Sequence, residues 1–322
     1  MTRAVVFAYH NVGVQCLATL LRHGVDVRLV VTHQDNPNET IWFDSVAALA
    51  RQHGIAVITP DDPNTADVIA QVQAAQPDFL FSFYYRNMLK APLLGIAKRG
   101  SYNMHGSLLP KYRGRVPVNW AIIHGELETG ATLHAMTEKP DNGAIVAQEA
   151  VPIGPDDTAQ DVFTAVTGAA GRALERVLPA LIASTAPHTP QDLTQGTYFK
   201  GRKPEDGRID FSWSAQRIHN FVRALTQPYP GAFADAATAG ESTQTKRIVI
   251  WRTSRKPLVD KGLGTTPCSN PLPPTLFSQA GELLLHCTDG HALQIHAMDA
   301  NGEAVTPLNF ARIFGKSTIQ VA

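Results

Sequence analysis

Cysteine is scarce in this chain and follows no metal-binding or disulfide pattern. The 322 residues include three cysteines, Cys16, Cys268 and Cys287. They form no Cys-x-x-Cys pair, and an odd number of widely separated cysteines argues against a disulfide framework or a zinc site. We therefore expect no metal and a reducing environment, the cytoplasm.

An excess of charge and long apolar runs are also missing. Lys and Arg total 28, as do Asp and Glu, so no global basic field would attract nucleic acid. No run reaches the roughly eighteen apolar residues of a membrane-spanning helix, and residues 1–8 resemble a strand rather than a secretory signal. With 44% hydrophobic and 17% charged residues, the composition predicts a globular chain, long enough for two domains, without membrane insertion.

Several catalytic signatures are absent. No Gly-x-Gly-x-x-Gly follows the first expected strand, where residues 9–13 read as a turn, so a dehydrogenase loses its main support. No Gly-x-Ser-x-Gly elbow is found, which disfavours hydrolysis by a serine nucleophile. The histidines form no His-Glu-x-x-His pattern, so a metal site is not expected.

Strand and helix patterns alternate through the first half of the chain. Short apolar runs predict strands at 4–8, 27–32, 55–58, 79–83 and 101–104. Helical spacing predicts helices at 14–21, 43–53, 65–75 and 88–97. This rhythm predicts an α/β fold with an open, mostly parallel, Rossmann-like sheet and helices on both faces. Ligands of such sheets bind beyond the carboxyl ends of the strands.

The second half changes character. Two further strands, at 131–136 and 145–151, precede a long helix that ends near Ala183. A helix at 214–225 is followed by short strands and a proline-rich loop at 271–274, which predicts a small β-barrel-like domain of the OB type. We expect a catalytic domain at 1–187, a linker at 188–206 and the β-barrel-like domain at 207–322.

The most informative stretch is Asn103-Met-His-Gly106. Asn103 and His105 lie two apart at the end of an expected strand, so their side chains leave on the same side. Asn can donate a hydrogen bond to a developing oxyanion, and His moves protons near neutral pH. Asp141 follows a strand that could lie beside theirs, where it would pair with His105 and raise the pKa of that imidazole. This trio suits acyl transfer without a covalent intermediate, although a structural histidine and a simple turn at 141–143 are the alternatives.

Two neighbouring stretches indicate a ligand. Lys111, Arg113 and Arg115 lie in a loop that prolines and Gly114 interrupt. A rigid cationic loop suits an anionic substrate or cofactor, whereas the alternative is a solvated face. The polar second half of the aromatic run at 81–89 could line a pocket for a flat heterocycle, the alternative being core packing.

Asn103, His105, the Ser-Leu-Leu-Pro-Lys-Tyr-Arg-Gly loop at 107–114 and Asp141 together resemble the 10-formyltetrahydrofolate-dependent formyltransferases. That family includes methionyl-tRNA formyltransferase and several sugar N-formyltransferases. Further stretches are similar to the formyltransferase half of the bifunctional polymyxin-resistance protein; they are 7–10, 32–37, 81–86 and 228–233.

That half formylates UDP-4-amino-4-deoxy-L-arabinose during lipid A modification. The resemblance therefore implies transfer of a formyl group from 10-formyltetrahydrofolate to the 4-amino group of such a UDP-amino sugar. No sugar-oxidising decarboxylase domain follows in this sequence, so two alternatives stay open: a separate decarboxylase protein acts as the partner that supplies the sugar, or the acceptor is another 4-amino sugar.

The resemblance also implies roles for individual residues. Catalysis would rest on Asn103, His105 and Asp141. The contacts to 10-formyltetrahydrofolate would come from Asn87, Met88, Leu89, Arg115, Thr137, Glu138, Lys139, Pro140 and Asp141. Substrate contacts would come from Tyr9, Asn11, Lys111, Arg113 and Arg202, with Arg202 placed on the diphosphate.

Three alternatives stay open at this stage. A methionyl-tRNA formyltransferase would bind a polyanion and should have a basic second domain, but charges after Gly207 show no strong bias. A different sugar N-formyltransferase would act on another amino sugar. A folate-binding or partner-binding module would keep the pocket without turnover. The sequence leaves the oligomeric state open.

Overall fold

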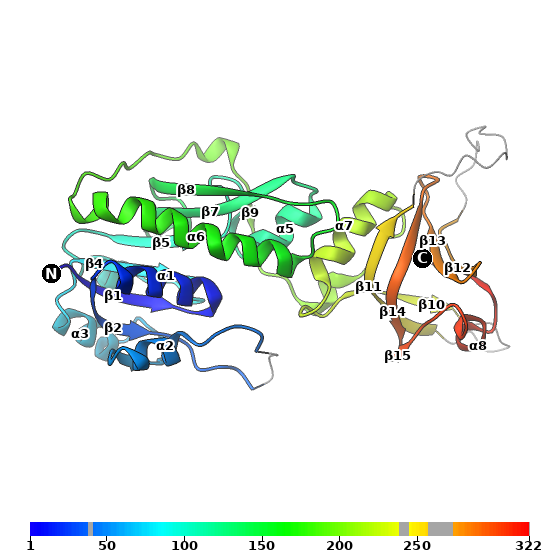
Figure 1. Cartoon of the computed structure of the whole chain (residues 1–322), viewed down its shortest axis with the longest axis horizontal. Helices are drawn as coiled ribbons and strands as arrows, with labels where there is room; N and C mark the ends of the chain where they lie inside the picture. Colours follow the sequence, from blue (N-terminus) through cyan, green and yellow to red (C-terminus); the bar gives the residue numbers. More distant parts are fainter. Residues whose placement is uncertain (38–40, 238–244, 257–272, 322) are drawn as a thin grey trace. The chain divides into compact units, whose positions relative to one another are not determined.

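The first sheet has seven strands in the order β3-β2-β1-β4-β5-β7-β8 (Figure 1). The structure, a computed structural model, describes residues 1–37, 41–237, 245–256 and 273–321. The strands are β1 (Arg3–Ala8), β2 (Asp26–Val31), β3 (Ala56–Ile58), β4 (Phe79–Phe83), β5 (Ser101–His105), β7 (Glu128–Ala135) and β8 (Ile145–Pro152). The pairs β3–β2, β2–β1, β1–β4 and β4–β5 are parallel, whereas β5–β7 and β7–β8 are antiparallel. The predicted open, mostly parallel sheet is confirmed.

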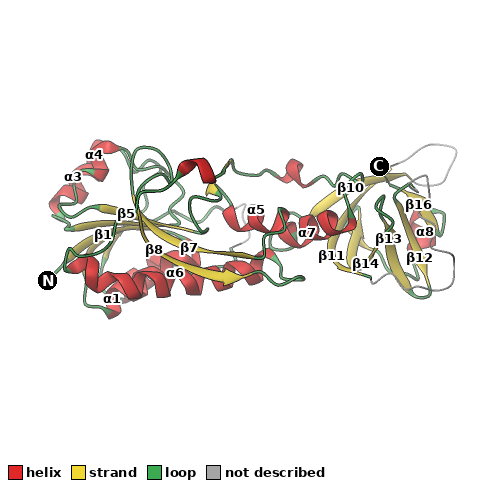
Figure 2. Ribbon diagram, turned by 90° about the horizontal axis from the view of Figure 1, so that it is seen from above, coloured by secondary structure: helices red, strands yellow, loops and turns green. Residues whose placement is uncertain are grey.

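Helices cover both faces of this sheet, as predicted. Figure 2 shows α3 and α4 on one side of the strands and α1 and α6 on the other. Ser45 and Thr65 start α2 and α3 by accepting hydrogen bonds from the backbone amides three residues on, which satisfies donors that the helix leaves unpaired. The helices are α1 (His10–Arg22), α2 (Val46–Gln52), α3 (Ala66–Ala74), α4 (Ala91–Leu94), α5 (Pro117–Ile123) and α6 (Ala159–Ile182).

Strand β1 explains why its sequence is apolar without alternation. It lies between β2 and β4, and residues 4–8 are fully buried. Val5 and Phe7 belong to a hydrophobic cluster with Val68 of α3 and Leu93 of α4. A strand covered on both faces needs apolar side chains in both directions, and this core fixes where the carboxyl edge of the sheet lies.

Two local predictions were wrong. Residues 9–13 are not a loop turn, because α1 begins at His10 directly after β1. The helix predicted at 88–97 is confined to Ala91–Leu94. Asn64 holds residues 88–90, which precede α4, in a loop, because its side-chain amide donates to Met88 O and accepts from Lys90 N. Such side-chain hydrogen bonds compete with the helical ones.

The second sheet is antiparallel, in the order β10-β11-β14-β13-β12-β16, with β15 against β14. An isolated bridge between Ala236 of β10 and Val321 joins the two edge regions. The sheet therefore curls, which confirms the predicted β-barrel-like domain. Its elements are α7 (Ala215–Leu225), β10 (Ala232–Ala237), β11 (Thr245–Arg255), β12 (Thr275–Gln279), β13 (Glu282–His286), β14 (Ala292–Ala300), β15 (Glu303–Ala304), α8 (Phe310–Phe314) and β16 (Thr318–Gln320). Cys268 and half of the loop predicted at 271–274 lie outside the described residues.

Contacts divide the chain into two compact units. The first comprises 1–118, 127–153 and 162–201, and the second comprises 119–126, 154–161 and 202–322. The segment expected as a linker contributes to the first unit, since β9 (Tyr198–Phe199) pairs in parallel with β6 (Arg113–Gly114). Short 3-10 turns at Leu193–Gln195 and Pro204–Gly207 complete the connection. In the described part of the chain, no helix is long and apolar enough to span a membrane.

Candidate active site

Strand β5 delivers Asn103 and His105 to the carboxyl edge of the first sheet. Its antiparallel neighbour β7 places His134 directly opposite Asn103. The chain leaves β7 at Ala135 and reaches Asp141 in the following turn. The strand predicted to run beside Asn103 does so, and the register adds a second histidine to the group.

Asp141 lies at the centre of these groups. Its Oδ1 is 3.6 Å from His105 Nδ1 and 3.4 Å from His134 Nε2. Its Oδ2 accepts a hydrogen bond of 2.8 Å from the backbone amide of Gly114. The side chains of His105 and Asp141 are only 8% and 11% exposed, so these interactions are shielded from solvent screening.

The environment holds Asp141 in its charged form. Burial by itself would raise its pKa, but the neighbouring His105, His134 and the Gly114 amide together outweigh burial. The pKa of Asp141 therefore lies well below its ordinary value. A carboxylate that stays ionised in a buried place can stabilise a cationic imidazole beside it.

The neighbours of His105 determine where it can take a proton. Its Nε2 lies 2.8 Å from the carbonyl oxygen of Tyr112. Because a carbonyl only accepts, Nε2 carries a hydrogen. The lone pair of neutral His105 is then on Nδ1, the nitrogen that faces Asp141. A proton arriving at Nδ1 would form an imidazolium directly beside the carboxylate.

His134 orients the amide of Asn103. Its Nδ1 donates to Ala135 O at 2.8 Å, which leaves Nε2 of the neutral ring as an acceptor. Asn103 Nδ2 lies 3.1 Å from that nitrogen and donates one of its two hydrogens. The second amide hydrogen of Asn103 remains for a ligand. The sequence offered one signal for His134, its place in a strand expected to lie beside Asn103.

The turn that carries Asp141 is held from the connector between the domains. Gln191 donates through Nε2 to the carbonyl oxygens of Asp141 at 2.9 Å and Gly143 at 2.6 Å. Arg113 donates through NH1 to Asn142 Oδ1 at 2.7 Å. Gln191 was missed at the sequence level, because it stands in a polar stretch without local pattern.

The residues expected to contact folate occupy loops of the first unit. Asn87 Nδ2 donates to Asp61 O, and Met88 is 52% exposed. Leu89 is buried in the hydrophobic cluster under α3 and α4, so only its main chain remains for a ligand. Arg115 donates to Arg86 O at 3.2 Å. This bond links the 84–90 loop to the loop that supplies the Gly114 amide.

The turn at 137–140 precedes Asp141. Thr137 Oγ1 donates to Lys139 O at 2.9 Å, so the turn is closed by its own side chain. Glu138 and Lys139 are exposed, and Pro140 is half-buried. This expected folate segment therefore lies directly beside Asp141 in the chain.

The expected substrate residues come from three separate segments of the chain. Tyr9 follows β1 and donates to Asp35 Oδ1 at 2.8 Å, and Asn11 Oδ1 accepts from Asp44 N. Lys111 is exposed in the loop before Arg113. Arg202 belongs to the second unit, where its guanidinium lies 4.7 Å from the centre of the Trp120 ring.

No cluster of three metal-ligating side chains occurs among residues 1–37, 41–237, 245–256 and 273–321. Asn103, His105 and Asp141 together provide an amide donor, an imidazole whose Nδ1 has a lone pair and a largely buried carboxylate. These are the components for stabilising an oxyanion and moving a proton.

The chain is similar in fold to solved formyltransferase structures. A crystal structure of an N-formyltransferase from Helicobacter canadensis, in complex with folinic acid and dTDP-3-aminofucose, is 21% identical, with a TM-score of 0.65; the match covers 92% of this chain and 99% of that one. WlaRD, a sugar 3N-formyl transferase crystallised with dTDP and 5-N-formyl-THF, is 20% identical at a TM-score of 0.65, over 92% of this chain and 97% of that one.

A third match has a different acceptor in its name. Phosphoribosylglycinamide formyltransferase from Bacillus halodurans is 26% identical, with a TM-score of 0.50, over 56% of this chain and 96% of that one.

The formyl transferase family model matches residues 3–178, and the model of the formyl transferase C-terminal domain matches 202–315. The chain belongs to the formyl transferase family and is a formyltransferase.

Proposed function

We propose that this protein transfers the formyl group of 10-formyltetrahydrofolate to the 4-amino group of a UDP-amino sugar, with UDP-4-amino-4-deoxy-L-arabinose as the acceptor. The convergence of Asn103, His105 and Asp141 at one edge of the sheet carries the proposal. Support for the two substrates comes from similar chains crystallised with formyl-folates, one of them together with dTDP-3-aminofucose and the other with dTDP. The resemblance of residues 7–10 and 32–37 to the polymyxin-resistance formyltransferase points to the arabinose derivative.

In this mechanism the acceptor amine attacks the formyl carbon, and negative charge builds on the formyl oxygen. Asn103 donates its second amide hydrogen to that oxygen while His134 holds the first. One such donor contributes about 3–4 kcal/mol to transition-state stabilisation. Asn103 therefore acts on the charge that develops rather than on the ground state.

His105 handles the proton. Nδ1 takes it from the attacking amine and returns it to the folate nitrogen as the carbon–nitrogen bond breaks. Asp141, 3.6 Å away, stabilises the intermediate imidazolium. General acid–base catalysis of this kind contributes about 10²–10⁴-fold.

The decisive experiment supplies 10-formyltetrahydrofolate with either UDP-4-amino-4-deoxy-L-arabinose, another UDP-4-amino sugar, or methionyl initiator tRNA. We expect a formylated product, identified by mass spectrometry, with the first acceptor. If only another UDP-4-amino sugar gave product, that sugar would be the acceptor in place of UDP-4-amino-4-deoxy-L-arabinose. If only the tRNA gave product, the protein would be a methionyl-tRNA formyltransferase.

His105→Ala separates an enzyme from a binding module. We expect this variant to lose formyl transfer and to keep folinic acid binding near the wild-type level, because the imidazole moves a proton rather than holding the folate. Full transfer in the His105→Ala protein would remove His105 from the mechanism.

A further inference from the structure

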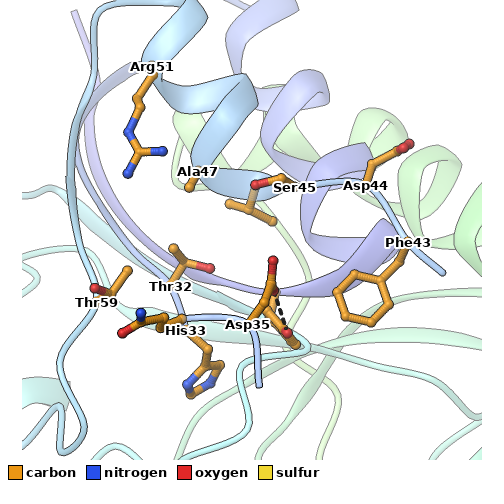
Figure 3. Close-up of a pocket in the computed structure, with 12 residues that line it drawn as sticks. Thr32, His33, Asp35, Phe43, Asp44, Ser45, Ala47, Arg51 and Thr59 are labelled. Carbon is orange, nitrogen blue, oxygen red and sulfur yellow. Dashed lines mark hydrogen bonds between the residues drawn. The ribbon is translucent and has the colours of Figure 1, made fainter. Parts of the chain in front are cut away.

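A cavity of about 340 Å³ opens beyond the carboxyl ends of β1, β2 and β3, and it contains none of the catalytic trio. It lies between the segment after β2 and the start of α2 (Figure 3). Its lining residues include hydroxyl, carboxylate, guanidinium and aromatic side chains; the ones used below are Tyr9, Thr32, Asp35, Phe43 and Arg51.

Thr32 lines this cavity and presents its hydroxyl to it. Its side chain is 2% exposed, and its hydroxyl has no hydrogen-bond partner among the described residues. Figure 3 shows the hydroxyl directed into the cavity. A hydroxyl can donate one hydrogen bond and accept others, so Thr32 offers a hydrogen-bonding group to a molecule in the cavity.

Asp35 adds an acceptor at the same edge. Its Oδ1 accepts from the Tyr9 hydroxyl at 2.8 Å, and its Oδ2 has no partner within the described part of the chain. Asp35 follows β2, the place from which an acidic side chain hydrogen-bonds ribose hydroxyls in nucleotide-binding sheets. The bond from Tyr9 fixes the carboxylate, so the free oxygen has a defined direction.

The remaining walls suit the other parts of a nucleotide. Phe43 packs edge-on against Tyr9, with ring centres 5.0 Å apart, and offers an apolar surface. Arg51 points toward the cavity from α2 (Figure 3) and has no ion-pair partner among the residues that the structure describes. Its planar guanidinium matches phosphate oxygens. A volume of about 340 Å³ lies at the small end of ligand sites, which span about 300–1,000 Å³.

We propose that this cavity binds the nucleoside diphosphate part of the sugar nucleotide, with the ribose diol on Asp35 and Thr32 and the phosphates on Arg51. The proposal rests on the proposed function for the identity of the ligand. It assigns nucleotide recognition to a place separate from the catalytic group.

The test is calorimetric titration of the full chain with UDP, 2′-deoxy-UDP and uridine. Asp35→Asn and Thr32→Val keep size, and the Asn oxygen can still accept from Tyr9. We expect each variant to weaken UDP binding about tenfold, which corresponds to about 1.4 kcal/mol. The wild type should prefer UDP over 2′-deoxy-UDP, and Asp35→Asn should lose this preference. Arg51→Gln should weaken UDP but leave uridine unchanged.

Two matched controls accompany these variants. Asp67→Asn alters an exposed carboxylate on α3, and Arg22→Gln alters an exposed guanidinium at the end of α1. Both should bind UDP like the wild type. The cavity assignment would be overturned if the wild type did not bind UDP. It would also be overturned if Asp35→Asn, Thr32→Val and Arg51→Gln all bound UDP with the affinity of the wild type.

Formyl transfer measured on the same proteins separates the two proposals. If Asp35→Asn transferred the formyl group with an unchanged KM for the UDP-amino sugar, the proposed function would be supported and nucleotide binding in the cavity would be contradicted. If UDP binding depended on Asp35 and Arg51 but no UDP-amino sugar were formylated, nucleotide binding in the cavity would be supported and the proposed function would be contradicted.

Discussion

Asn103 has two amide hydrogens, and His134 accepts one of them. The same His134 nitrogen lies 3.4 Å from Asp141, so protonation of His134 would make it a donor and reverse the preferred orientation of the Asn103 amide. The neutral ring is therefore the form in which Asn103 presents its hydrogen to an oxyanion. At this scale, the orientation of the Asn103 amide depends on the neighbouring His134.

Gln191 gives a test of such support. Gln191→Leu removes both hydrogen bonds to the Asp141 turn while keeping a similar volume. We expect turnover to fall about 10–100-fold, since a misplaced catalytic group costs that much, and the pH–rate profile to shift because the contact between Asp141 and His105 changes.

The control is Gln195→Leu, because Gln195 is exposed and donates only to Asp192 nearby. It should retain wild-type turnover. A Gln191→Leu protein with the wild-type pH–rate profile would show that Gln191 has no part in positioning Asp141.

Asp141 also links stability to acid. Its folded pKa is lowered by His105, His134 and Gly114 against the effect of burial. The stabilisation is thus fully present above the unfolded pKa, about 3.9, and is lost as pH falls toward the folded value.

We expect the free energy of unfolding of the wild type to fall more steeply below about pH 4 than that of Asp141→Asn. Urea titrations at several pH values would measure both slopes. Equal slopes would contradict the lowered pKa.

At the scale of elements, the turn after β7 is set by close backbone approach. A Cβ on Gly143 would lie 1.8 Å from the carbonyl oxygen of Ala135. Asp141 itself has a φ of 55°, in the left-handed region. The turn therefore cannot relax easily around a larger residue at 143.

Gly143→Ala should displace the turn. We expect a loss of about 1–3 kcal/mol in unfolding free energy together with a loss of formyl transfer, measured by thermal unfolding and by mass spectrometry of the formylated product. The control is Gly168→Ala within α6, where the added Cβ meets only the flexible Arg172 side chain at 3.3 Å. That substitution should stabilise the protein by about 0.5–1 kcal/mol and keep activity, whereas a neutral Gly143→Ala would refute the steric argument.

For the whole molecule, two half-buried histidines, His10 and His33, contribute to the response to mild acid. Burial, and then the charge of Arg86, lower the pKa of His10 and of His33 from 6.5 to about 4. Between these values the unfolded chain binds more protons than the folded one, so stability falls as pH falls from 6.5 to about 4.

His33→Gln tests this at the level of global stability. The Gln oxygen can still accept the Arg86 amide hydrogen that His33 Nε2 accepts at 3.0 Å, but it does not titrate. We expect the variant to lose less unfolding free energy than the wild type between pH 6.5 and 4. The exposed His53, changed to Gln, should leave the slope unchanged; an identical slope in His33→Gln would contradict the lowered pKa.

The sequence by itself determined the strand–helix alternation of the first half and the shared side of Asn103 and His105, because these follow from periods of two and 3.6 residues. It also determined the buried character of β1, because an unbroken apolar run marks a strand covered on both faces. Only the tertiary structure decided that His134 faces Asn103 and that Gln191 holds the Asp141 turn. The register of antiparallel neighbours and the path of a polar connector depend on contacts between distant segments, and no local spacing records them. The same reason explains why Arg202 stacks on Trp120 in the second unit and why the cavity beside Thr32 and Asp35 became visible only in the folded chain.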